Sequence, residues 1–259
     1  MNWRLGVAGF PIEHSLSPKL HEAGLAQVGL TGTSERVALH ESEAGRLGEL
    51  LGSRFDALSI TMPLKALATG ACDELEPVAA RLGVVNSMLV RDGRVVGTAT
   101  DGDGFVDSLR AQFDLEPAGL AVAVLGAGGA ARGIVDALAR GGATTISVTG
   151  RTSARVEWLV ARYDVVVATA RPPGTVDLIV NTVPVDGREG AEVIDGATAS
   201  TVCVDVLYEP RLTPWRAAYA DLGCRTANGV GMLAYQAARQ MSWWWGRDVD
   251  AALLMKVVA

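Results

Sequence analysis

Residues that build disulfide and metal sites are scarce in this sequence. Three cysteines and three histidines occur among 259 residues, and the sequence contains no Cys-x-x-Cys pair. An odd number of widely spaced cysteines argues against a disulfide framework and favours a reducing compartment. The histidines show no spacing typical of metal ligands. We therefore expect a cytoplasmic protein with buried thiols and without a metal site.

Basic residues and long apolar runs are also in short supply. Lys and Arg together number 23 against 29 Asp and Glu, which gives a net charge of −6. A protein that binds nucleic acid needs a basic face, so a nucleic-acid partner is not expected. The uncharged run at 118–131 contains four glycines and is shorter than the ~18 apolar residues of a membrane span. The first eleven residues are too short and glycine-rich for a signal-peptide core, so we predict no membrane association.

Apolar residues are nevertheless plentiful, at 49% of the chain, which is enough for a sizeable core. Short apolar runs alternate with stretches of helical spacing along nearly the whole sequence. Strands separated by helices predict an α/β fold with parallel sheets and right-handed crossovers. A hairpin turned by Asp92-Gly93 adds an antiparallel pair. The spacing predicts helices over 73–82, 101–113 and 229–246.

A glycine-rich turn follows the most strand-like run of the chain, 120–125. Gly126, Gly128 and Ala131 fit the pattern G-x-G-x-x-[G/A], in which small residues permit a tight turn and a close approach to a pyrophosphate. The N-terminus of the following helix would then face the phosphates. A glycine-rich turn without a ligand is the alternative, but the strand before it and the helix after it favour a dinucleotide. The predicted binding residues of this turn are Gly126, Ala127, Gly128, Gly129 and Ala130.

Arginines follow the next predicted strand, where an NAD site usually carries Asp or Glu. Arg151 and Thr152 come directly after Gly150, and Arg155 lies one helical turn further on. The planar guanidinium group binds phosphate oxygens bidentately, so the pattern favours the 2′-phosphate of NADP. Arginines that merely point to solvent at a helix start are the alternative. We predict NADP rather than NAD, with Arg151, Thr152 and Arg155 in its site.

Polar residues of the first hundred positions collect at predicted strand ends and loops, where binding groups are common. Taken singly, each has an ordinary explanation: Ser17 as a helix cap, Lys65 as a solvated lysine, Asp101 as another cap. Their joint order is more specific. Eight motifs follow one another: Ser15-Leu-Ser17-Pro18, Ser59-Ile-Thr61-Met-Pro63-Leu-Lys65, Gly83-Val-Val-Asn86-Ser87, Thr100-Asp101-Gly-Asp-Gly104-Phe105, Asn181-Thr182-Val-Pro184, Asp205-Val-Leu-Tyr208-Glu-Pro210, Thr213-Pro214 and Asn228-Gly-Val-Gly231-Met232-Leu233-Ala-Tyr-Gln236.

This series resembles the NADP-dependent bacterial shikimate dehydrogenase family over essentially the whole chain. The resemblance implies reversible reduction of 3-dehydroshikimate to shikimate with NADPH, a step towards the aromatic amino acids. It also implies two domains. Residues 1–101 and 229–259 would form a mixed or parallel α/β substrate domain, and residues 102–228 a Rossmann-type, doubly wound NADP-binding domain. A monomer and a homodimer are both compatible with this architecture.

The resemblance also assigns roles to individual residues. Lys65 and Asp101 would be the catalytic pair, since the alkoxide left by hydride delivery needs a proton that an ammonium group can donate. Gly231 would bring its backbone close to the nicotinamide. The implied substrate-binding residues are Ser15, Ser17, Thr61, Asn86, Asp101, Tyr208 and Gln236.

Three positions depart from the family pattern. Ser59 and Ala99 stand where the family usually has asparagine, and Gly150 replaces the asparagine before Arg151. We expect weaker binding or a slightly altered substrate preference from the first two, and one lost ribose contact from the third. Three alternatives stay open: a quinate/shikimate dehydrogenase working with NAD, an aminoshikimate dehydrogenase, and a non-catalytic sensor of NADPH and a small acid. The arginine argues against NAD, and the retained lysine–aspartate pair argues against a sensor.

Overall fold

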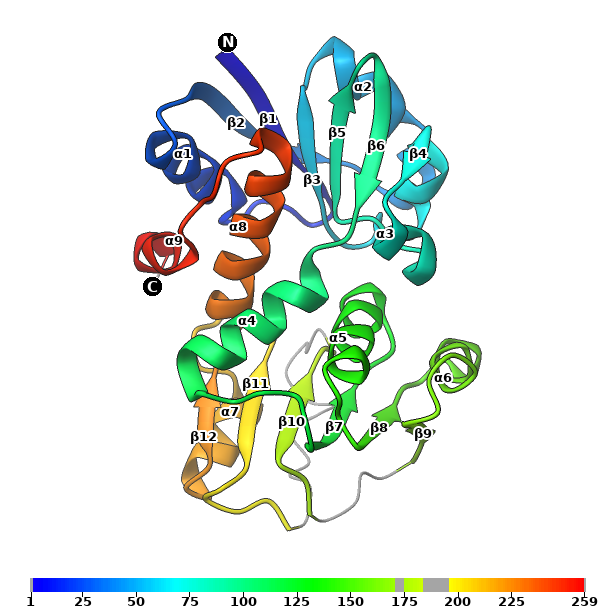
Figure 1. Cartoon of the computed structure of the whole chain (residues 1–259), viewed down its shortest axis with the longest axis vertical. Helices are drawn as coiled ribbons and strands as arrows, with labels where there is room; N and C mark the ends of the chain where they lie inside the picture. Colours follow the sequence, from blue (N-terminus) through cyan, green and yellow to red (C-terminus); the bar gives the residue numbers. More distant parts are fainter. Residues whose placement is uncertain (1, 171–174, 184–195, 259) are drawn as a thin grey trace. The chain divides into compact units, whose positions relative to one another are not determined.

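The computed structural model describes residues 2–170, 175–183 and 196–258, so Pro184 of the fifth motif lies outside the described residues. The chain forms two compact units, the first comprising Met1–Gly104 and Ala234–Ala259, the second Phe105–Leu233. Each unit is built around a six-stranded sheet (Figure 1). The predicted α/β fold is confirmed. Among the described residues, no helix combines the length and apolar character needed to cross a bilayer.

The sheet of the first unit has the strand order β2-β1-β3-β5-β6-β4. Its strands are β1 (Asn2–Gly9), β2 (Thr31–Ala38), β3 (Ala57–Ile60), β4 (Glu74–Leu75), β5 (Ser87–Arg91) and β6 (Arg94–Thr98). β1 runs parallel to β2 and β3, whereas β5 is antiparallel to both β3 and β6. The turn between β5 and β6 uses Asp92 and Gly93, both with positive φ (52° and 76°), as a two-residue hairpin requires. The sheet is therefore mixed, as predicted.

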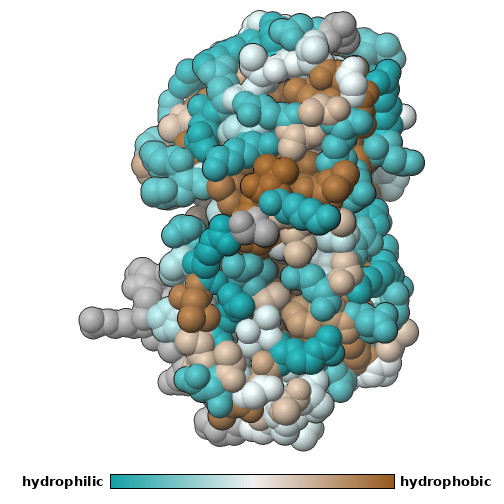
Figure 2. All heavy atoms as spheres, turned by 90° about the vertical axis from the view of Figure 1, so that its left-hand side faces the viewer, coloured by the Kyte–Doolittle hydropathy of each residue, from teal (hydrophilic) through white to brown (hydrophobic). Residues whose placement is uncertain are grey.

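Helices cover this sheet and also link the two units. They are α1 (Ser17–Gln27), α2 (Arg46–Ser53), α3 (Pro77–Leu82), α4 (Asp101–Phe113), α8 (Val230–Trp245) and α9 (Ala251–Val258), with short 3-10 turns η1 (Glu41–Glu43) and η2 (Leu67–Ala71). The division between the units falls within α4 and α8. α9 lies on the left in Figure 1, the side that faces the viewer in Figure 2. That face carries a contiguous hydrophobic patch among hydrophilic residues, and Leu253 and Val257 of α9 are exposed.

Residues 73–82 do not form the single helix that their spacing predicted. Glu74–Leu75 form β4, which pairs in parallel with β6, and α3 begins at Pro77. Glu76 is extended, with ψ near 150°, because the residue before a proline disfavours the helical region. Proline itself suits the first turn of a helix. The prediction was therefore wrong over its first four residues.

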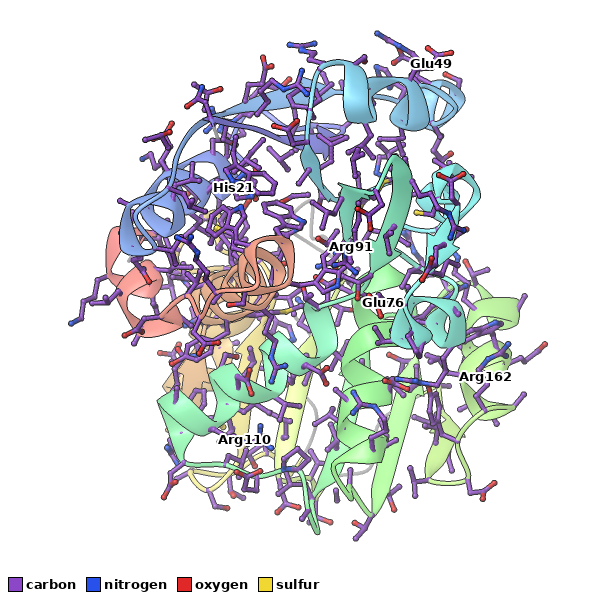
Figure 3. The ribbon with its side chains drawn as sticks, turned by 45° about the horizontal axis from the view of Figure 1, so that its top comes forward. His21, Glu49, Glu76, Arg91, Arg110 and Arg162 are labelled. Atoms are coloured by element: carbon purple, nitrogen blue, oxygen red, sulfur yellow. The ribbon has the colours of Figure 1, made fainter. Side chains whose placement is uncertain are left out.

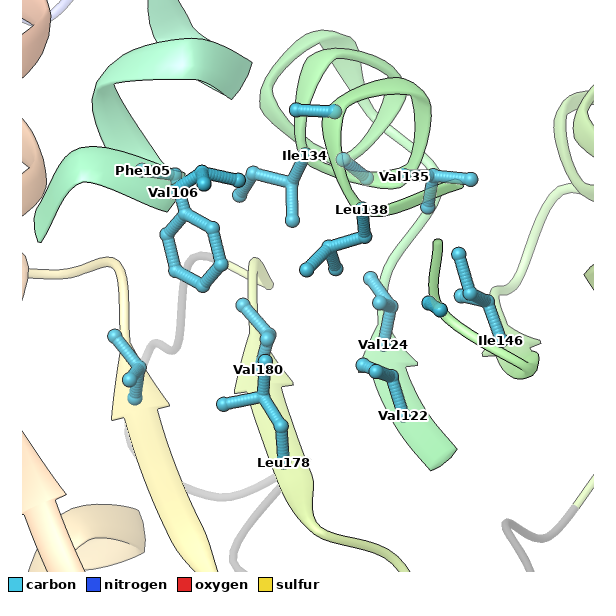
Figure 4. Packing of buried hydrophobic residues seen from close by; sticks show 14 of the residues in the cluster. Phe105, Val106, Val122, Val124, Ile134, Val135, Leu138, Ile146, Leu178 and Val180 are labelled. Atoms are coloured by element: carbon cyan, nitrogen blue, oxygen red, sulfur yellow. The ribbon is translucent and has the colours of Figure 1, made fainter. Parts of the chain in front are cut away.

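The second unit holds a fully parallel sheet with the order β12-β11-β10-β7-β8-β9. Its strands are β7 (Ala121–Leu125), β8 (Thr145–Thr149), β9 (Val166–Ala168), β10 (Leu178–Asn181), β11 (Val202–Asp205) and β12 (Arg225–Ala227); its helices include α5 (Gly129–Arg140), α6 (Ser153–Val160) and α7 (Pro214–Asp221). Figure 4 shows Ile134 and Leu138 of α5 packed over Val122, Val124 and Val180. This strand order is the doubly wound one, in which ligands bind where the order reverses, beside the carboxyl ends of β7 and β10.

Candidate functional site

Topology gathers three of the predicted substrate residues, Thr61, Asn86 and Asp101, at one edge of the first sheet. β3 ends at Ile60, and Thr61 follows it. Because β5 is antiparallel to β3 and β6, the start of β5 and the end of β6 lie at that same edge. Asn86 precedes β5, and Asp101 follows β6 at the first residue of α4. Segments far apart in the chain therefore converge here.

A partly buried ion pair lies at this edge. Lys65 Nζ donates to Asp101 Oδ2 at 2.6 Å, and the two side chains are 17% and 7% exposed. A charge-assisted hydrogen bond of this length is short and strong. The position of Asp101 in the first turn of α4 also suits a carboxylate, because the N-terminus of a helix carries partial positive charge. An ammonium group has three N–H donors, and the bond to Asp101 engages one of them.

Asn86 connects this pair to α8. Its Nδ2 donates to Asp101 Oδ1 and to Gln236 Oε1, each at 3.0 Å. Gly104 permits the close approach of α4 to α8, because a Cβ at this position would come within 2.5 Å of Gln236 Cα. Lys65, Asn86, Asp101 and Gln236 are therefore brought together by direct contacts.

Thr100 also belongs to this cluster, although it was not predicted as a site residue. Its backbone N–H donates to Asn86 Oδ1 at 2.8 Å, and its hydroxyl donates to the Gln236 carbonyl at 3.0 Å. The first bond fixes the Asn86 amide so that Nδ2 faces Asp101. Its position directly before Asp101 in the fourth motif is the feature of the sequence that could have identified Thr100 as a site residue.

The two serines of the first motif lie in the loop and first turn after β1. Ser15 and Ser17 are each 8% exposed, and Arg36 donates to the Ser15 carbonyl at 2.6 Å. The alternative role of Ser17 as a helix cap is wrong, since Leu16 occupies the cap position and no side chain caps α1.

Thr61 is half-buried at the end of β3. Tyr208 lies in the second unit, half-buried after β11. The binding roles of these four residues stay predictions.

Ser59 and Ala99, the departures from the family pattern, are both buried. The Ser59 hydroxyl donates to Gln240 Oε1 at 2.9 Å and lies 2.9 Å from His21 Nε2. Burial lowers the pKa of His21 to about 3. His21 is therefore uncharged in the folded protein at neutral pH.

The low pKa of His21 makes folding stability depend on pH. In the unfolded chain its pKa is near 6.5 and in the folded chain about 3, so acidification adds a proton to the unfolded state first. Stability is retained above pH 6.5 and falls below it; from pH 7 to pH 5 this group alone lowers the free energy of unfolding by about 2 kcal/mol. The free energy of unfolding, measured by urea denaturation, should depend less steeply on pH for His21→Gln than for wild type. Equal slopes for both proteins would contradict this assignment.

The glycine turn of the second unit has the geometry that a pyrophosphate needs. Gly126 has φ +106°, and a Cβ there would clash with the Thr182 hydroxyl at the end of β10. Gly128 is the N-cap of α5; no side chain caps this helix, and the space where a Cβ would stand is open. The first N–H groups of a helix lack intrahelical partners and form a natural phosphate site. The turn therefore fits the dinucleotide predicted for it.

Arginines surround the start of α6 in the same unit. Arg151 and Arg155 are exposed, and Thr152 is the N-cap of α6. Arg132, half-buried in α5, stacks over Trp158 of α6 with its guanidinium carbon 4.4 Å from the ring centre. Burial lowers the pKa of Arg132, and so do the nearby cations Arg155 and Arg162.

Such a gathering of positive charge fits a 2′-phosphate. Arg132 and Trp158 were not predicted, because their contact joins two helices and leaves no local pattern in the sequence. The roles of Arg151, Thr152 and Arg155 in binding NADP stay predictions.

Gly231 has a packing explanation that is independent of a cofactor. A Cβ here would clash with the Gln112 side chain of α4. Glycine therefore lets α4 and α8 pack closely within the second unit, and its predicted place beside the nicotinamide stays a prediction. Across the described residues, no three His, Cys, Asp or Glu side chains form a group able to hold a metal ion.

Comparison with known proteins gives a consistent result. A family model described as the shikimate dehydrogenase substrate binding domain matches residues 7–88. A shikimate dehydrogenase (NADP(+)) from Gluconobacter oxydans (strain 621H) is 38% identical over 258 residues, covering 95% of this chain and 91% of that protein.

Solved structures share the fold over the whole length. Shikimate 5-dehydrogenase from Thermus thermophilus, in complex with NADP(H) and shikimate, has a TM-score of 0.87 and 30% identity, covering 99% of this chain and 98% of that one. The ligand-free 5-ketofructose reductase of Gluconobacter sp. strain CHM43 has a TM-score of 0.86 and 26% identity, covering 100% and 98%. The resemblance drawn from the motifs is confirmed: this chain belongs to the shikimate dehydrogenase family.

Proposed function

We propose that this protein is an NADP-dependent oxidoreductase that reversibly reduces 3-dehydroshikimate to shikimate in the biosynthesis of aromatic amino acids. The observation that carries the proposal is the partly buried bond between Lys65 and Asp101, which Asn86 connects to Gln236 of α8. Relatives of this name over nearly the full length support it. The proposed partners are small molecules, and the free thiols of Cys72, Cys203 and Cys224 support the proposal of a cytoplasmic location.

The chemistry assigned to the pair is a proton transfer at the ketone oxygen. NADPH, when bound, supplies the hydride. The reduced carbonyl oxygen then carries negative charge, and Lys65 Nζ donates a proton to it, leaving a neutral amine that regains its proton from water. Asp101 holds the ammonium group in place through the 2.6 Å bond. General acid catalysis of this kind contributes about 10²–10⁴-fold to the rate.

The remaining residues orient the substrate. Ser15, Ser17 and Tyr208 are proposed to bind the carboxylate, and Thr61, Asn86, Asp101 and Gln236 the ring hydroxyls. A hydroxyl-rich ring requires matched donors and acceptors, because each buried polar group left unpaired costs about 1–3 kcal/mol. The Asn86 amide, whose orientation Thr100 fixes, supplies such a matched group.

The second unit is proposed to hold NADP. The segment from Gly126 to Ala130 would bind the pyrophosphate, Arg151, Thr152 and Arg155 the 2′-phosphate, and Gly231 the nicotinamide end. With these assignments, residues 1–101 and 229–259 act as the substrate domain and residues 102–228 as the NADP-binding domain. Either a monomer or a homodimer can carry this arrangement.

A panel of substrates and cofactors tests the proposal. Shikimate, quinate and aminoshikimate are each supplied with NAD and with NADP, and 5-ketofructose is supplied with NADPH because a reductase of that compound shares the fold. We expect the highest kcat/KM for shikimate with NADP. A preference for another substrate would replace the proposed reaction, and binding without turnover would favour the sensor.

A further inference from the structure

A continuous chain of hydrogen bonds runs through the interior of the first unit and ends at Asn86. Ser34 Oγ lies 2.7 Å from His21 Nδ1, and Ser59 Oγ lies 2.9 Å from His21 Nε2. Ser59 in turn contacts Gln240 Oε1 at 2.9 Å, and Gln240 Nε2 donates to the Asn86 carbonyl at 3.1 Å. His21 (Figure 3), Ser59, Gln240 and Asn86 are all less than 9% exposed. A buried hydrogen-bond network in which every donor and acceptor is paired holds its side chains rigidly in one arrangement.

The Asn86 carbonyl at the end of this chain determines which group is the donor and which the acceptor in every bond. The Asn86 carbonyl can only accept, so the amide nitrogen of Gln240 faces it and the amide oxygen faces Ser59. Ser59 must then donate to that oxygen, and it accepts from His21 Nε2–H. Neutral histidine has one donor and one acceptor nitrogen, so Nδ1 accepts from Ser34. The low pKa of His21 agrees with this neutral form.

The end of the chain bears directly on the candidate site. The Asn86 carbonyl also accepts from Ile60 N–H at 2.7 Å, so Gln240 and β3 hold the Asn86 backbone together. The Asn86 side chain contacts Asp101 and Gln236. Gln240 lies one helical turn beyond Gln236 on α8, on the same helix face. α8 thus presents one carboxamide to the Asn86 side chain and a second to its backbone.

We infer that Gln240 is a positioning residue, which sets the placement of Asn86 for substrate binding through the Asn86 backbone. The inference rests on the proposed function, since that function makes Asn86 a ligand of the substrate. Within the described part of the chain, the Gln240 side chain bonds to the Ser59 hydroxyl and to the Asn86 carbonyl, and of these two residues Asn86 is the one assigned to the substrate. Its effect therefore reaches the substrate through Asn86 alone.

Replacement of Gln240 by leucine tests the inference. Gln240→Leu removes the donor to Asn86 and leaves the Ser59 hydroxyl without its acceptor. We expect the Kd for shikimate, read by calorimetry, and its KM to rise about tenfold, with kcat changed less than about threefold and the KM for NADP unchanged. An unchanged Kd for shikimate would overturn the inference.

Replacement by glutamate gives a readout that a merely structural role would not move. A neutral carboxylic acid has one donor and one acceptor, like the amide, whereas a carboxylate only accepts and would face the Asn86 carbonyl. Burial raises the pKa of a carboxyl group. The Kd of Gln240→Glu for shikimate is therefore divided by the wild-type Kd at each pH. Acidification protonates the glutamate, so we expect this ratio to fall towards one. A ratio independent of pH would overturn the inference, even if the leucine variant fails to fold.

Met241→Ala is the matched control. Met241 is buried beside Gln240 in α8 and packs at Gly24, so its truncation leaves a cavity and lowers stability without breaking the hydrogen-bond chain. Its Kd for shikimate should equal that of wild type; a tenfold rise here would show that the effect at Gln240 is merely structural. Failure of the proposed function is seen separately, as absence of turnover by wild type. Absence of shikimate binding by wild type would overturn both proposals.

Discussion

Lys65→Ala is expected to lower kcat for 3-dehydroshikimate reduction by about 10²–10⁴-fold, with a much smaller change in KM. In the proposed mechanism the lysine delivers the proton to the substrate oxygen, and water is a poor substitute for an acid held in place. The Asp101 carboxylate, 7% exposed, then loses its ammonium partner, so thermal stability is measured alongside the kinetics. Steady-state rates with NADPH at saturating substrate give the comparison.

Lys19→Ala serves as the control for this prediction. Lys19 is exposed on α1, and its removal changes the net charge equally without touching the pair. It should turn over at the wild-type rate. Near-normal turnover by Lys65→Ala would remove Lys65 from the proposed mechanism.

Arg151→Asp should reverse the cofactor preference, so that kcat/KM becomes higher with NAD than with NADP. A carboxylate repels the 2′-phosphate and can instead accept hydrogen bonds from ribose hydroxyls. Loss of a charged hydrogen bond and gain of repulsion amount to at least about tenfold weaker NADP binding. Arg155 and its neighbour Arg132 keep their positive charges in this variant, so we expect the binding of NADP to be weakened rather than abolished. Kinetics with each cofactor at fixed shikimate measure the switch.

An equal change of charge elsewhere gives the comparison for this variant. Arg46, exposed and paired with Glu43 in the first unit, can be replaced by aspartate without altering the second unit. Arg46→Asp should keep the wild-type preference. If Arg151→Asp binds NADP as tightly as wild type does, the assignment of the 2′-phosphate to Arg151 is wrong.

Local patterns made the second unit largely predictable. A strand, a glycine turn and a helix are adjacent in sequence. The tight turn at Gly126 and the start of α5 can therefore be predicted from one short segment of about fifteen residues. The same holds for the hairpin at Asp92-Gly93 and for the helix over 101–113, which the structure reproduces as α4. Each depends on neighbouring residues alone.

Contacts between distant segments were harder to predict. Asn86 and Gln236 are 150 positions apart, and Ser59 and Gln240 are 181 apart. Helical periodicity identifies Gln240 only as a polar residue on a helix, and nothing local names its partners. The family resemblance supplied Asn86 and Gln236, but it gave no role to Thr100, Arg132 or Gln240. α9 likewise lay outside the elements predicted.

Pairing across the sheet also overrode local propensity. Residues 73–76 have helical spacing, yet Glu74 and Leu75 gain backbone hydrogen bonds by pairing with β6. Figure 3 shows Glu76 near Arg91 of β5, and the side-chain atoms of this pair lie 3.7 Å apart. Such a gain depends on a strand that arrives about twenty residues later in the chain.

The most direct measurement is NADPH oxidation by the purified full chain with 3-dehydroshikimate, run beside calorimetric binding of both compounds. We expect rapid, stoichiometric conversion to shikimate by the unaltered protein. Tight binding of both ligands with no loss of NADPH would contradict an acid–base role for Lys65 and Asp101, and would identify the protein as a sensor.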